Sequence, residues 1–257
     1  MTHISRRAML LGAASTATNQ LLVSGVRATT AHLHSSGCIL CRAANMRLMR
    51  SNGIVASSDQ SIEILDSSGD AATDHFLGIA LRRLALTFEV SPGFGFYDDS
   101  RAPNAFATES TVFPNSNGTV LMGRILFSKL LLQSSDNGMT VIAICAHEFG
   151  HIYQLANKYC DQLKAMDVTD RPIELHADFL AGFFLARRKK DHSDLELQQV
   201  GEAFYKAGGT DFINPQHHGT SLERITAIEA GYQLGRDSSA GIDAAAKAGF
   251  EKVRLMV

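Results

Sequence analysis

The residues best suited to chemistry are two histidines and a glutamate in the run His147-Glu148-Phe149-Gly150-His151. Each residue of an α-helix turns by about 100°, so His147 and His151 lie one turn apart on one face and can bind one metal ion. Glu148 lies to the side, where it can reach a water molecule beside the metal without being a ligand. This spacing of two imidazoles and a carboxylate is typical of zinc hydrolysis.

A zinc site of this kind needs a third protein ligand, and the sequence offers one in the run Glu174-Leu175-His176-Ala177-Asp178. Glu174 and Asp178 share a helix face, whereas His176 is rotated by about 160° from Asp178. We therefore expect Glu174 to be the third metal ligand. Asp178 is placed to accept a hydrogen bond from a ligand histidine and to fix its tautomer. The alternative is an amphipathic helix whose acids face solvent.

Apolar periodicity and turn residues predict the elements that position these motifs. We expect helices over 72–88, 139–159, 170–190, 194–207 and 221–234, strands over 94–97 and 103–113, and a strand continuing as a helix over 119–132. With 257 residues and 45% hydrophobic content, the chain is long enough for one domain with a substantial core. The predicted fold class is α+β, mainly helical.

Four stretches together resemble the M48 family of zinc metallopeptidases and the related gluzincins. They are Asn104-Ala105-Phe106-Ala107, the segments 146–151 and 174–178, and the segment from His218 to Arg224. The last stretch is also similar to a His-Gly-Thr segment of bacterial neutral zinc metallopeptidases. The resemblance covers roughly residues 72 to 234 and implies a zincin-like, or minigluzincin, domain with a small β-sheet and an active-site helix bearing the H-E-x-x-H motif.

The resemblance also implies roles for residues outside the two zinc motifs. It makes 104–107 part of an edge strand near the substrate cleft, where an extended peptide could add as a further strand. It assigns His218 to the stabilisation of the oxyanion that develops on the scissile carbonyl, with His217 as the alternative. Arg224 either orients this loop or caps the last helix.

These observations favour an exported zinc-dependent metalloendopeptidase that acts on protein or peptide substrates. One Zn²⁺ per chain is held by His147, His151 and Glu174, and Glu148 is the general base that takes a proton from the attacking water. One alternative is a zinc-holding periplasmic chaperone or assembly factor with little proteolysis. Another is a buried polar cluster without metal.

The N-terminus is typical of an export signal. Arg6 and Arg7 follow Ser5 and precede a mildly apolar stretch, and cleavage after Ala28 is plausible from the small residues before it. We therefore expect a twin-arginine signal peptide over 1–28, a weakly structured segment over 29–71, and the metallopeptidase-like domain over 72–257. The expected location is the bacterial periplasm or the medium, and the alternative for the first segment is an ordinary amphipathic helix.

Composition disfavours two other classes of protein. The net charge is −2, without the basic excess typical of nucleic-acid binding. No apolar run reaches the length of about 18 residues that a transmembrane helix needs, so we expect no span in the mature chain. Among the cysteines, Cys38 and Cys41 form a C-x-x-C pair for which a structural or inert role is favoured over a redox one. Cys145 and Cys160 are too far apart along a helix for a disulfide.

Overall fold

The computed structural model describes residues 30–32, 39–40, 61–101, 103–133, 138–191, 198–207 and 216–257. The predicted signal peptide over 1–28 and the pair Cys38 and Cys41 lie outside these ranges. The described helices are α2 (Ala71–Phe88), α3 (Arg124–Gln133), α4 (Met139–Ala156), α5 (Tyr159–Lys164), α6 (Arg171–Asp191), α7 (Gln198–Ala207), α8 (Ser221–Asp237) and α9 (Ile242–Arg254). The described strands are β1 (Thr30–His32), β2 (Ile39–Leu40), β3 (Ser61–Glu63), β4 (Gly93–Tyr97), β5 (Ala105–Thr108) and β6 (Thr119–Gly123).

The expectation of a mainly helical chain with a small sheet is confirmed. The strand that continues as a helix is observed as β6 followed by α3. The helix expected over 139–159 is shorter than expected, because Lys158 takes the left-handed conformation with φ of 60° and separates α4 from α5. The strand expected over 103–113 is limited to Ala105–Thr108.

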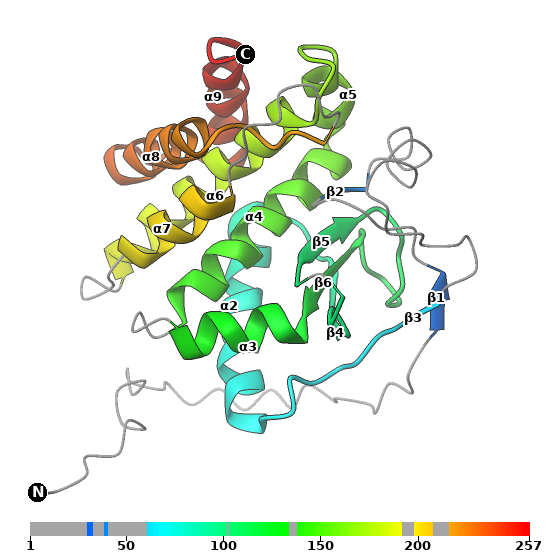
Figure 1. The fold of residues 1–257 in the computed structure, drawn as a ribbon. Coiled ribbons are helices and arrows are strands. Elements are labelled where there is room, and N and C mark those ends of the chain that lie inside the picture. The colour runs from blue at the N-terminus through cyan, green and yellow to red at the C-terminus, as the bar shows by residue number, and fades with distance from the viewer. Residues whose placement is uncertain are drawn as a thin grey trace, which may run out of the picture.

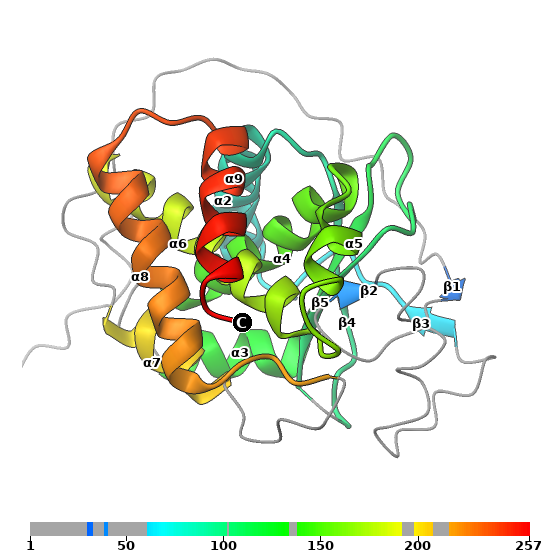
Figure 2. The ribbon, with the colours of Figure 1, turned by 90° about the horizontal axis from the view of Figure 1, so that it is seen from above.

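Helix α9 was not expected from the sequence. Its buried positions recur at three- and four-residue intervals, but several are alanine or glycine, so its apolar stripe is weak: Ile242, Ala245, Ala246, Gly249 and Val253. Packing against a neighbouring helix can stabilise such a helix, because its small residues permit a close approach. Figure 2 shows α9 lying between α8 and α5.

The main sheet has the strand order β2-β5-β6-β4, with β5 antiparallel to β6 and β4 parallel to β6. Strand β2 lies outside β5 and pairs Ile39 with Ala107 and Leu40 with Thr108. The expectation that 104–107 belongs to an edge strand is therefore wrong at Ala107, because a segment of the chain's own N-terminal region is hydrogen-bonded there. Within that region β1 also pairs with β3.

Helix α4 runs between the sheet on one side and α6 on the other, with α2 behind it (Figure 1). Its packing includes Phe149, whose ring meets Phe88 of α2 edge to face at 6.3 Å between centroids. Because α4 is enclosed on so many sides, its polar side chains are taken out of water and need partners within the protein.

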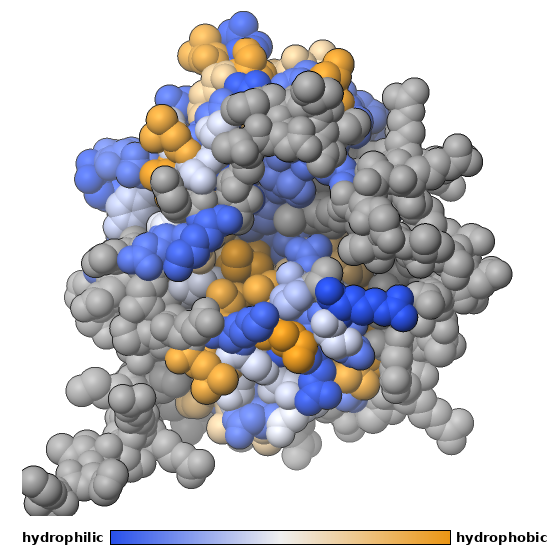
Figure 3. Space-filling model, in the orientation of Figure 1, coloured by the Kyte–Doolittle hydropathy of each residue, from blue (hydrophilic) through white to orange (hydrophobic). Residues whose placement is uncertain are grey.

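Among the residues that Figure 3 colours, apolar groups are interspersed with charged ones. Over the described parts of the chain, no helix combines the length and the apolar character needed to cross a membrane.

Candidate metal centre

Helices α4 and α6 approach closely at the point where the two predicted zinc motifs face each other. A Cβ atom at Gly150 would lie 3.3 Å from the Cα and carbonyl oxygen of Ala177, so a larger residue would push the two helices apart. Gly150 lies between the two motif histidines, and Ala177 lies between Glu174 and Asp178. The small residues at the contact therefore let the side chains on either side of it meet.

Three side chains converge there, in a geometry that suits one metal ion. His147 Nε2 lies 3.0 Å from His151 Nε2 and 3.2 Å from Glu174 Oε2, and His151 Nε2 lies 3.5 Å from Glu174 Oε1. Ligand atoms about 2.0–2.1 Å from a tetrahedral zinc ion lie about 3.3 Å from one another. The described structure thus contains a buried His147, His151 and Glu174 group that could hold a metal ion.

The electrostatics of the cluster keep the carboxylate ionised. Burial alone would raise the pKa of Glu174, but His218, His151 and His147 around it hold this pKa well below its ordinary value. The carboxylate is fully buried. An ionised, buried carboxylate is a group that can also serve as a ligand for a cation.

His147 is oriented by an acidic partner on α6. Its Nδ1 lies 2.8 Å from Asp178 Oδ1, where the sequence placed a carboxylate for a ligand histidine. Arg224 of α8 donates to both oxygens of Asp178, from Nε and Nη2, at 2.7 Å each. Burial would raise the pKa of Asp178, yet Arg224 and His147 together lower it, so the Asp178 carboxylate can accept a hydrogen bond from His147 Nδ1.

Arg224 thus has a main contact that the sequence did not indicate. Thr220 caps α8 and forms a capping box with Glu223, so Arg224 is not the cap. Its guanidinium lies 5.5 Å from the ring of Phe204, which also stands 5.9 Å from the ring of His147. Phe204 of α7 therefore packs on one side of the centre.

His151 is oriented by neutral groups that the sequence analysis missed. Its Nδ1 lies 2.9 Å from Gln154 Oε1, and Gln154 Nε2 lies 2.8 Å from the carbonyl oxygen of Ile173 and 3.0 Å from His176 Nδ1. His176 Nε2 lies 2.9 Å from the carbonyl oxygen of Ala246 in α9. The available signal was that Gln154 follows His151 by three residues, which places both on one helix face.

The remaining predicted catalytic residues are Glu148, His218 and its alternative His217. Glu148 is buried on α4 beside His147, and burial together with the negative charge of Glu148 raises the pKa of the neighbouring Cys145 thiol. His218 Nδ1 lies 3.1 Å from Glu174 Oε2, and its side chain is 28% exposed. His217 is buried, which lowers its pKa. Of the two histidines, His218 is the one that the structure brings to Glu174.

The predicted substrate-binding stretch forms the strand next to α4. Asn104 accepts hydrogen bonds on its carbonyl oxygen from the Tyr97 hydroxyl at 3.2 Å and from the Gly123 amide at 2.9 Å. The side chains of Ala105, Phe106 and Ala107 are buried in the hydrophobic core. Side chains in this stretch therefore stabilise the sheet, and only its backbone could serve an added strand.

The centre as a whole is enclosed. The exposed fractions are 2% for His147, 1% for Glu148, and 0% for both His151 and Glu174. The side chain of His218 is 28% exposed, whereas those of His147, His151 and Glu174 are 0–3% exposed.

Comparisons with models of protein families, with curated proteins and with solved structures find no match for this chain. No relative supplies a function for this chain, so the chemistry of the site itself must indicate one.

Proposed function

We propose that this chain is a zinc-dependent metalloendopeptidase, with one Zn²⁺ held by His147, His151 and Glu174. The observation that carries the proposal is the direction of the two imidazoles. If each imidazole is protonated at the Nδ1 that faces its acceptor, the two Nε2 lone pairs lie 3.0 Å apart. Such lone pairs repel unless a cation lies between them, and a nearby carboxylate completes a set of ligands that zinc favours.

Glu148 is the proposed general base. Its carboxylate takes the proton of the attacking water and delivers it to the leaving amine. When bound in such a site, zinc lowers the pKa of a coordinated water and polarises the substrate carbonyl. His218, the partly exposed neighbour of Glu174, is the proposed donor to the oxyanion that forms on the scissile carbonyl. The substrate backbone would pair along the free part of β5.

The enclosure of the site favours a second candidate, a zinc-holding chaperone or assembly factor. Metal ligands with exposed fractions of 0 to 2% resemble a structural zinc site more closely than an open catalytic one. In this candidate the metal stabilises the contact between α4 and α6, and proton transfer by Glu148 has no part in the function.

The substitution Glu148→Gln separates the two candidates. Gln is nearly isosteric with Glu but cannot accept a proton at neutral pH, so hydrolysis of an unfolded protein should fall by roughly 10²–10⁴-fold while zinc content stays the same. The measurement is turnover by the purified protein, with elemental analysis and thermal melting as controls. Equal cleavage by both forms would contradict the peptidase proposal, whereas binding of unfolded protein without cleavage by either form would support the chaperone.

The ligand assignment has its own test in His151→Ala. This variant leaves two protein ligands and should lose most of its zinc, measured by elemental analysis after purification. The matched control is His75→Ala, which removes an exposed imidazole on α2, away from the proposed ligands, and should keep the metal. Unchanged zinc in His151→Ala would overturn the assignment.

A further inference from the structure

Gln154 is a fully buried amide at the start of a chain of hydrogen bonds that leads from His151 to helix α9. The direction of its amide follows from chemistry. The atom that lies 2.8 Å from the Ile173 carbonyl oxygen must be the NH₂ group, because a carbonyl oxygen can only accept. The other end of the amide, Oε1, therefore faces His151 as an acceptor.

The same reasoning fixes the proton on His176. Gln154 Nε2 also lies 3.0 Å from His176 Nδ1, so this nitrogen accepts and carries no proton. His176 Nε2 carries the proton instead and donates it to the Ala246 carbonyl oxygen at 2.9 Å. Two backbone carbonyls, those of Ile173 and Ala246, thus determine the direction of every hydrogen bond between them.

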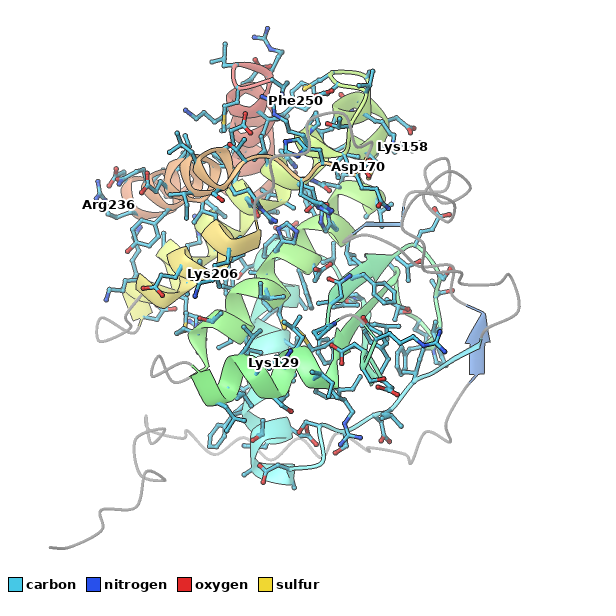
Figure 4. The ribbon with its side chains drawn as sticks, viewed as in Figure 1. Lys129, Lys158, Asp170, Lys206, Arg236 and Phe250 are labelled. Carbon is cyan, nitrogen blue, oxygen red and sulfur yellow. The ribbon has the colours of Figure 1, made fainter. Side chains whose placement is uncertain are left out.

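The ring of His176 is also held mechanically. It stacks on Tyr159 with 5.1 Å between centroids and 21° between planes. Tyr159 also contacts Phe250 of α9, with 6.0 Å between ring centroids. Figure 4 labels Phe250 on α9. His176 is fully buried, so solvent does not compete for its two ring nitrogens.

We infer that Gln154 and His176 are positioning residues that hold His151 in the tautomer protonated at Nδ1, which leaves Nε2 free to bind a metal ion. The inference deepens the proposed function and rests on the same ligand set. It differs from the His147 arrangement, where an ionised Asp178 paired with Arg224 does the orienting. His147 is thus oriented by the ion pair of Asp178 and Arg224, whereas His151 is oriented by the neutral side chains of Gln154 and His176.

The first arm of the test reads the tautomers directly in the metal-free full-length protein. Long-range ¹H–¹⁵N correlation spectra of ¹⁵N-labelled protein at neutral pH should show His151 protonated at Nδ1 and His176 protonated at Nε2. His151→Ala and His176→Phe identify the two signals by their loss. A wild-type His151 that is protonated at Nε2, or that averages between tautomers, would overturn the inference.

The second arm measures Zn²⁺ affinity by competition with a chromophoric chelator. Gln154→Met keeps the length of the side chain but offers only a weakly accepting sulfur, so affinity should fall about 10–100-fold. Gln154→Glu retains an oxygen acceptor for His151 but places its second oxygen against the Ile173 carbonyl oxygen, so it should recover only part of the affinity. His176→Phe keeps an aromatic ring against Tyr159 and should give a smaller loss than Gln154→Met, since the Ile173 carbonyl still orients the amide.

The matched control is Tyr153→Phe. The Tyr153 hydroxyl donates to Asp243 of α9 at 2.6 Å, so its loss also weakens the contact between α4 and α9 without touching an imidazole. Affinity in this variant should stay within about threefold of the wild type. An equal loss in Tyr153→Phe and Gln154→Met would show that helix docking, rather than the tautomer, sets the affinity, and would overturn the inference.

The two arms also separate this inference from the proposed function. If the wild type binds zinc but hydrolyses nothing, the peptidase proposal fails while both arms still report on Gln154. If the wild type binds no zinc, the metal proposal fails, and the tautomer of His151 in wild type and in Gln154→Met alone decides the inference.

Discussion

His176 shows how a single buried side chain can serve a site that it does not enter. It lies on α6 within two residues of Glu174 but turns away from the ligand cluster toward α9. Burial lowers its pKa from the ordinary value of 6.5 to about 4, because the charged imidazolium would be taken out of water. The neutral form is the one that can accept from Gln154 and donate to Ala246 at the same time.

This lowered pKa predicts a pH dependence of stability. In the unfolded chain His176 takes up a proton as pH falls through 6.5, whereas the folded form resists protonation until about pH 4. Its contribution is therefore fully present above pH 6.5 and is lost as pH falls toward 4. Over that window the free energy of unfolding should fall by up to about 1.4 kcal/mol per pH unit from this group.

Urea unfolding of wild type and His176→Phe at several pH values between 4 and 7, with a chelator present, measures this contribution. The difference between the two proteins should change across the window, because other titrating groups contribute to both. A difference that is constant with pH would contradict the assignment of a buried neutral imidazole.

At the scale of elements, the contact between α6 and α8 places Arg224 beside Asp178. This helix contact depends on glycines, which leave room for the backbone of the facing helix. A Cβ atom at Gly231 would lie 1.8 Å from the carbonyl oxygen of Phe179, and one at Gly182 would lie 2.0 Å from that of Ile228. Because the obstacles are backbone atoms, no change of side-chain rotamer can relieve the clash.

Gly231→Ala should accordingly destabilise the protein by at least about 1–3 kcal/mol, since the two helices must separate. The matched control is Gly78→Ala on α2, where a Cβ atom meets nothing within 4 Å. That change should be neutral or stabilising by up to about 1 kcal/mol, since alanine favours the helix. Chemical denaturation of both variants gives the comparison, and equal effects would contradict the close packing described for α6 and α8.

For the whole molecule, the proposed zinc ion joins α4 to α6 and so couples metal binding to global stability. At a free Zn²⁺ concentration 1,000 times the dissociation constant, binding stabilises the folded form by about 4 kcal/mol. Chelation should lower the thermal midpoint of the wild type and leave that of His151→Ala unchanged. A chelator effect of the same size in both proteins would indicate that the metal binds elsewhere.

Export is a separate prediction, made for a part of the chain outside the described residues. We propose the twin-arginine route from Arg6 and Arg7. Replacing both with lysine keeps the charge but removes the planar guanidinium, so precursor should accumulate in the cytoplasm, as cell fractionation and processing would show. Normal processing of the Lys-Lys form would instead favour general secretion or no export.

Several features of the molecule were determined by the sequence alone, because they depend on neighbours within a few residues. The period of apolar residues predicted α2, α6, α8 and the succession of β6 and α3. The four-residue spacing of His147 and His151 places both on one helix face, and the same spacing relates Glu174 to Asp178. The left-handed conformation of Lys158 and the alanine-rich helix α9 were not predicted, because the local sequence indicates each of them only weakly.

The tertiary structure alone decided which distant groups meet. Arg224 reaches Asp178 across 46 residues of sequence, and His176 reaches the carbonyl of Ala246 across 70. Neither partner can be found from periodicity, since each contact depends on how closely whole helices pack. Small residues such as Gly150 and Ala177 allow the close approach of α4 and α6. The proposed ligands were therefore recognisable in the sequence, whereas the groups that contact their ring nitrogens appeared only once the helices were placed against one another.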